Sequence, residues 1–140
     1  MPMLTEMPRE TRLLAVDDNS DSAELVARIG SRSGYEVMAT SDPTEVRTLI
    51  RCWRPEVLTI DLCMPELDAI ELFSILKESR FDGRLLIISG QGDWLRKQAS
   101  KLAAAHGIRV VGDMQKPIDV PQLRQLLASM LPAASLTPSS

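Results

Sequence analysis

Five residues with ionisable or hydroxyl side chains stand at or directly after the ends of short strand-like runs. They are Asp17, Asp18, Asp61, Ser89 and Lys116. Aliphatic runs of this length predict strands of a parallel sheet, and the carboxyl ends of such strands meet at one edge of the sheet. We therefore expect three carboxylates, one hydroxyl and one ammonium to converge in a shallow pocket at that edge.

This set of groups predicts a metal site. Carboxylates within hydrogen-bonding range repel one another, and their pKa rises unless a cation shares the site. The ligands available are oxygen atoms, because the sequence has no pair of His or Cys residues at ligand spacing. Oxygen ligands suit a hard ion that keeps some of its waters, so Mg²⁺ is predicted in preference to Zn²⁺.

Magnesium in turn indicates phosphate chemistry. Phosphoryl transfer requires an in-line nucleophile, a metal that bridges it to the phosphate, and donors for the remaining phosphoryl oxygens. Asp61 can supply the nucleophile, while Ser89 and Lys116 can supply donors. Gly90 follows Ser89 and leaves space beside the phosphoryl position, with an unhindered backbone N–H. The residues themselves therefore predict a phosphoacceptor site.

The order of elements explains how these residues can meet. Five aliphatic runs alternate with amphipathic stretches, a pattern typical of βαβ units. The predicted strands are residues 12–17, 35–39, 56–61, 84–89 and 108–111. Because crossovers between parallel strands are right-handed, the leading candidate is an α/β domain with an open, doubly wound, five-stranded parallel sheet in the order 2-1-3-4-5.

The amphipathic stretches have the 3.6-residue period of helices with one apolar face. The apolar positions are Val46, Leu49, Ile50 and Trp53, then Ile70, Phe73 and Leu76, and finally Leu123, Leu126, Leu127 and Met130. Asp42 and Pro43 predict the start of one helix, and Asp119 predicts the cap of the last. Gly34 and Gly107 follow helices, where a left-handed residue is favoured.

Length and composition indicate a single domain. The chain has 140 residues, of which 44% are hydrophobic and 25% charged, as in ordinary globular proteins. We expect residues 11–131 to form the domain, residues 1–10 to be an N-terminal tail, and residues 132–140 to be a C-terminal tail or linker. Cys52 and Cys63 are expected near opposite ends of one strand, too far apart to pair, and therefore to be free thiols.

Charge and hydropathy argue against two classes of partner. The net charge is -3 and basic residues are scattered, which argues against direct binding to nucleic acid. No segment approaches the roughly 20 apolar residues of a membrane span, and residues 1–10 have no signal-peptide core. The sequence thus predicts a cytoplasmic protein that does not bind a membrane.

Four short motifs carry a resemblance to a known family. In chain order they are Asp17-Asp18, Asp61-Leu62-Cys63-Met64-Pro65, Ser89-Gly90 and Lys116-Pro117. Together, in this order and at strand ends, they resemble the receiver domain of bacterial two-component response regulators, over nearly the whole domain. The resemblance implies a flavodoxin-like (βα)5 three-layer sandwich.

The resemblance also implies roles for the residues of the acidic site. Asp61 would be phosphorylated from the phospho-His of a histidine kinase. Asp18, Asp61 and the backbone carbonyl of Cys63 would bind Mg²⁺, and Asp17 would act through a metal-bound water.

Further roles concern the phosphoryl group and the output. Ser89 and Lys116 would bind the phosphoryl oxygens, and phosphorylation would change the face built by the family's helix 4, strand 5 and helix 5. The partners implied are a sensor histidine kinase or phosphotransfer protein and a downstream effector domain or protein. A phosphorylation-dependent homodimer is also compatible. The output is binding, so no enzymatic activity is predicted.

One position departs from the family pattern. The residue three before the lysine is usually Tyr or Phe, which swings inward when the Ser or Thr moves onto the phosphoryl group, whereas this chain has Asp113. We hypothesise that this domain signals by shifting the Ser89 loop and the following helix, or through a surface that includes Asp113. Identical structures of that face with and without a phosphoryl mimic would contradict the hypothesis.

Three other functions remain as alternatives. A degenerate receiver that serves as a constitutive protein-interaction module is conceivable because of Asp113. A phosphatase of the haloacid dehalogenase type needs a second Asp two residues after the nucleophile, where this chain has Cys63. A flavodoxin-like FMN carrier needs a phosphate-binding loop after the first strand, where Asp17 and Asp18 would repel the phosphate.

Overall fold

The computed structural model describes residues 10–61, 69–90 and 92–132. Five strands form one parallel sheet in the order β2-β1-β3-β4-β5, as predicted. The strands are β1 (Arg12–Val16), β2 (Glu36–Thr40), β3 (Val57–Ile60), β4 (Arg84–Ser89) and β5 (Arg109–Gln115). The helices are α2 (Ser20–Arg32), α3 (Pro43–Cys52), α4 (Ala69–Glu78), α5 (Asp93–Ala105) and α6 (Val120–Ser129). The domain is a flavodoxin-like three-layer sandwich.

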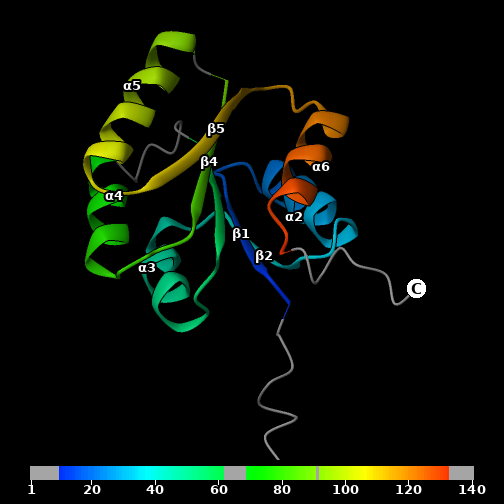
Figure 1. Cartoon of the computed structure of the whole chain (residues 1–140), viewed down its shortest axis with the longest axis horizontal. Helices are drawn as coiled ribbons and strands as arrows, with labels where there is room; N and C mark the ends of the chain where they lie inside the picture. Colours follow the sequence, from blue (N-terminus) through cyan, green and yellow to red (C-terminus); the bar gives the residue numbers. More distant parts are fainter. Residues whose placement is uncertain (1–9, 62–68, 91, 133–140) are drawn as a thin grey trace, which may run out of the picture.

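Helices cover both faces of the sheet (Figure 1). On one face α3, α4 and α5 pack through residues such as Ile50, Phe73 and Ala103. On the other face α2 and α6 pack through Val26 and Leu127. The central strands β1, β3 and β4 are therefore buried on both sides, which explains their near-continuous aliphatic sequences.

The helix ends were predicted correctly from local sequence. The side chain of Asp42 accepts a hydrogen bond from the backbone N–H of Thr44, and that of Asp119 accepts one from Gln122. Gly34 and Gly107 both have positive φ angles, of 107° and 79°, at the ends of the turns that follow α2 and α5.

Three sequence predictions were wrong in detail. The last strand was predicted at residues 108–111 but extends over Arg109–Gln115, because it is an edge strand whose outer positions are polar and escape a search for aliphatic runs. Ile70 was assigned to an apolar helix face but is 56% exposed, since it lies in the first turn of α4. Cys52 is the exposed last residue of α3 and does not lie at the start of a strand; it is a free thiol, while Cys63 is outside the described residues.

Within the described ranges, no helix is both long and apolar enough to cross a membrane.

Tyr35 ties the last helix to the rest of the domain. Its side chain is buried, and its hydroxyl donates a hydrogen bond to the backbone carbonyl of Leu127 in α6, at 2.5 Å. Burial raises the pKa of Tyr35 to about 12, although the charge of Arg84 lowers it in part.

We expect the ionisation of Tyr35, the chain's one tyrosine, to reduce stability at high pH. The unfolded chain releases the phenolic proton near pH 10 and the folded chain near the raised pKa of about 12, so stability is lost as pH rises across that window. Denaturant unfolding at several pH values should show a loss of about 1.4 kcal/mol per pH unit. Tyr35→Phe should remove this part of the pH dependence and cost about 1 kcal/mol at neutral pH. An unchanged slope in Tyr35→Phe would contradict the assignment.

Candidate functional site

The register of neighbouring strands places Asp17 beside Asp61. Val16 of β1 is paired with Ile60 of β3, so the residues that follow leave the sheet together. The backbone N–H of Asp61 donates to the carbonyl of Val16 at 3.0 Å, and that of Asp17 donates to Thr40 at 3.1 Å. These bonds hold both aspartates at the carboxyl edge of the sheet, one residue beyond the ends of β1 and β3.

The adjoining pair of strands brings in Ser89 and Lys116. Ser89 ends β4 and is paired with Gln115, the last residue of β5. The backbone N–H of Lys116 donates to the carbonyl of Ser89 at 2.9 Å, and the peptide bond from Lys116 to Pro117 is cis. Ser89 is fully buried, and a Cβ added at Gly90 would meet nothing within 4 Å, which agrees with the space expected there.

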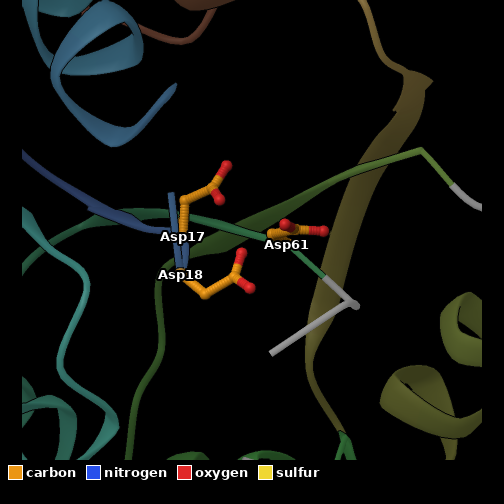
Figure 2. A group of neighbouring side chains, drawn as sticks. All are labelled: Asp17, Asp18 and Asp61. Atoms are coloured by element: carbon orange, nitrogen blue, oxygen red, sulfur yellow. The ribbon is translucent and has the colours of Figure 1, made fainter. Parts of the chain in front are cut away.

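Three carboxylates form a cluster at this edge. One oxygen from each of Asp17, Asp18 and Asp61 lies within 4.8 Å of the others. Asp17 and Asp61 are only 5% and 6% exposed, whereas Asp18 is exposed. Figure 2 shows the side chains of Asp17 and Asp18 leaning toward Asp61. The cluster therefore combines a buried pair of carboxylates with a third that faces solvent.

Lys116 partly neutralises the cluster. Its Nζ lies 2.8 Å from Oδ2 of Asp17 and 3.1 Å from Oδ2 of Asp61. Burial lowers the pKa of Lys116, but the hydrogen bonds and negative charges of Asp17 and Asp61 outweigh burial and raise the pKa above its usual value. The ammonium is therefore charged at neutral pH, and it joins the ends of three strands.

The cluster still carries excess negative charge. Burial raises the pKa of Asp17, and the charge of Asp61 adds to that rise. Hydrogen bonds from Lys116 and from the backbone N–H of Asn19, at 2.9 Å, oppose it. One ammonium cannot balance three carboxylates, so a further cation would be stabilised here. Clustered carboxylate oxygens, one of them open to solvent, fit a hydrated hard cation such as Mg²⁺.

Most of the predicted site residues come together. Asp17, Asp18, Asp61 and Lys116 form the cluster, and Ser89 lies on the adjacent strand end. The predicted metal ligand at Cys63 is outside the described residues.

Sequence reasoning missed Asn19. Its backbone N–H orients Asp17, and its side chain caps α2 by accepting from the N–H of Ser22, at 3.1 Å. An Asn before a helical stretch is a common cap signal, and it could have been read from the sequence. Asn19 thus couples the start of α2 to the orientation of the acidic site.

A family comparison agrees with this fold and site. Residues 13–128 match the family model described as "Response regulator receiver domain". The match covers most of the chain, including nearly all of the sheet and the residues of the acidic edge described above. The chain belongs to the response regulator receiver domain family, which serves in two-component systems.

Individual relatives support the assignment. Response regulator MprA of Mycobacterium leprae (strain TN) is 32% identical over 80 residues, or 57% of this chain and 35% of that protein. Sporulation initiation phosphotransferase F of Bacillus subtilis (strain 168) is 23% identical over 89% of this chain and 96% of its own length. A crystal structure of a response regulator from Colwellia psychrerythraea is 29% identical, with a TM-score of 0.75, covering 87% of this chain and 97% of that one. The chain spans about a third of the length of the MprA relative.

Removing the ammonium of Lys116 should destabilise the domain. We expect Lys116→Met to lower the free energy of unfolding by about 3 kcal/mol at pH 7, because two buried carboxylates lose their counter-ion. The folded-state pKa of Asp17 is already raised, so the folded state gains a proton more readily than the unfolded state as pH falls. The loss of unfolding free energy caused by Lys116→Met should therefore be smaller at acid pH. Denaturant unfolding at pH 7 and pH 5 measures both effects.

The matched control is Lys101→Met, at an exposed position of α5. It should change stability little at either pH. A Lys116→Met deficit that is the same size at both pH values would contradict the electrostatic explanation.

Proposed function

We propose that this receiver domain accepts a phosphoryl group on Asp61 from a phospho-histidine donor, in a reaction that requires Mg²⁺. The observation that carries the proposal is the arrangement around Asp61, which is a buried carboxylate 3.1 Å from a charged lysine and within 4.8 Å of two further carboxylate groups. A carboxylate in a structural ion pair would need one counter-ion and no additional negative charges. The cluster is better explained by a reaction that brings in a cation and a phosphoryl group.

The chemistry follows from the groups present. A carboxylate oxygen of Asp61 attacks phosphorus, the phosphorus–nitrogen bond of the donor breaks, and the donor histidine leaves with the electron pair. Mg²⁺ would supply charge neutralisation between the carboxylates and the phosphoryl oxygens. Asp18 and Asp61 are the proposed direct ligands, together with the backbone carbonyl of Cys63. Asp17 would act through a metal-bound water.

Ser89 and Lys116 are the proposed partners of the phosphoryl oxygens. The Lys116 ammonium is already at hydrogen-bond distance from Asp61, so it can follow the negative charge onto the new phosphoryl group. Ser89 ends the neighbouring strand, and its backbone carbonyl holds Lys116. The two donors are thus positioned by one another as well as by the sheet.

The proposed output is binding and not catalysis. Phosphorylation would shift an equilibrium between two arrangements of the face formed by α5, β5 and α6, for which a coupling of about 1–3 kcal/mol is usual. A sensor histidine kinase or a phosphotransfer protein would donate, and an effector domain or protein would respond, with a phosphorylation-dependent homodimer as one form of output. The name of the Bacillus relative, a sporulation initiation phosphotransferase, is consistent with a phosphorelay. We also propose that the protein is cytoplasmic and that residues 11–131 form the receiver domain.

We expect Asp61 to be the phosphorylated residue. Incubation with acetyl phosphate and Mg²⁺, followed by intact-mass analysis, should show a gain of one phosphoryl group in the native chain. Asp61→Asn should abolish the gain, because an amide is not a comparable nucleophile. Asp82→Asn, at an exposed position near the other edge of the sheet, should keep it.

Binding of beryllofluoride in the presence of Mg²⁺ provides a second measurement if the phosphoryl group is lost quickly. An adduct that persists in Asp61→Asn would contradict the assignment of the residue. The absence of both an adduct and beryllofluoride binding in the native chain would favour a degenerate receiver that acts as a constitutive interaction module.

We also expect Mg²⁺ to stabilise the domain through Asp18. At a Mg²⁺ concentration tenfold above the dissociation constant, the free energy of unfolding should rise by about 1.4 kcal/mol. Asp18→Asn should remove most of this gain, while raising stability without Mg²⁺ because one of three repelling charges is lost. Thermal unfolding with and without Mg²⁺ tests both effects, with Asp82→Asn as the control. An equal Mg²⁺ response in Asp18→Asn would exclude Asp18 as a ligand.

A further inference from the structure

An ion pair between a buried arginine and a partly exposed aspartate joins helix α5 to strand β5. Nε of Arg96 lies 3.2 Å from Oδ1 of Asp113, and the side chains are 6% and 34% exposed. Arginine is almost never buried without a charged or polar partner, and its guanidinium does not lose its proton in proteins. The pair is therefore a strong constraint on how α5 can sit against β5.

The pair occupies a specific place relative to the proposed phosphorylation site. Asp113 lies three residues before Lys116 and is paired with Ile87, two residues before Ser89. Arg96 lies in the first turn of the helix that follows Ser89 and the loop after it. The ion pair thus connects the segment that follows Ser89 to the strand that ends just before Lys116. Ser89 and Lys116 are the two proposed phosphoryl-binding residues.

An irregularity in β5 determines which way Asp113 faces. Leu85 is paired with Val110 and Leu86 with Gly112, so Val111 is an extra residue in β5. Side chains alternate along a strand, and one inserted residue exchanges the faces of all later side chains. The irregularity therefore allows Asp113 to face α5.

An exposed ion pair elsewhere shows the contrast. Arg47 of α3 and Glu78 of α4 are 3.4 Å apart, with side chains 47% and 61% exposed. Exposed pairs of this kind hold their elements weakly, because water competes for both charges. In the Arg96–Asp113 pair the cation is shielded from water. If one partner is displaced, either the other partner moves with it or the ion pair breaks.

We propose that the Arg96–Asp113 ion pair is the positioning element that transmits phosphorylation of Asp61 to helix α5. This inference rests on the proposed function, because it assumes that Ser89 and Lys116 bind the phosphoryl group. When they do, the chain on both sides of the pair is displaced, and the pair obliges the start of α5 to move with β5. Trp94, which is 72% exposed, lies in that first turn and would present the change at the surface.

The test measures hydrogen–deuterium exchange of residues 93–105 with and without Mg²⁺ and beryllofluoride. In the native chain, ligand binding should change the exchange rate of this helix at least about fivefold, the lower end of usual allosteric coupling. Asp113→Asn should still bind beryllofluoride but lose this change. Asp113→Glu, which keeps the charge, should retain it.

A second variant breaks the pair without leaving a buried charge. Arg96→Met replaces the guanidinium with an apolar chain of similar length, and the partly exposed Asp113 remains solvated. It should uncouple α5 in the same way as Asp113→Asn. Glu78→Gln, which breaks the exposed control pair, should leave the response of residues 93–105 unchanged.

The outcomes separate the two proposals. If Asp113→Asn and Arg96→Met bind beryllofluoride and keep the full exchange response, the proposed role of the ion pair is overturned and the proposed function still stands. A native chain that binds beryllofluoride without any change in residues 93–105 would also overturn it. A native chain that neither gains a phosphoryl group nor binds beryllofluoride would overturn both proposals. A purely structural pair would lower the stability of both variants without altering the exchange response.

Discussion

The repulsion between carboxylates at one edge of the sheet is the constraint on which the rest of the site depends. Asp17 and Asp61 are nearly buried and close to Asp18, an arrangement that a flexible chain would avoid. The parallel sheet enforces it, because β1 and β3 are hydrogen-bonded in a register that releases both aspartates at the same level. The stability of the packed core is thus used to maintain a site that attracts cations.

Lys116 reduces the repulsion among these carboxylates. It reaches the cluster from β5, on the far side of β4, and contacts carboxylates that follow two other strands. The same residue therefore stabilises the folded state and is the proposed donor to the phosphoryl group. A group with both roles links stability to function, since any event that draws the ammonium away from Asp61 also redistributes charge among the strand ends.

Much of the fold and most of the site could be predicted because they depend on local signals. Aliphatic runs indicated the buried strands, and Asp42 and Asp119 indicated helix starts that the structure confirms. The convergence of Asp61 and Lys116 followed from the rule that parallel strands share a carboxyl edge. The extent of β5 and the exposure of Ile70 did not follow, because an edge strand and a first helical turn are each only partly covered by neighbouring elements.

The sequence by itself thus determined the order of the elements, the helix caps and the identity of the residues at the strand ends, all of which are encoded within a few neighbouring positions. Only the tertiary structure decided which charges meet across the fold. Arg96 and Asp113 are separated by 17 positions and share no sequence motif. Their contact depends on how α5 packs on the sheet and on the extra residue at Val111, which sets the face of the strand from which Asp113 projects.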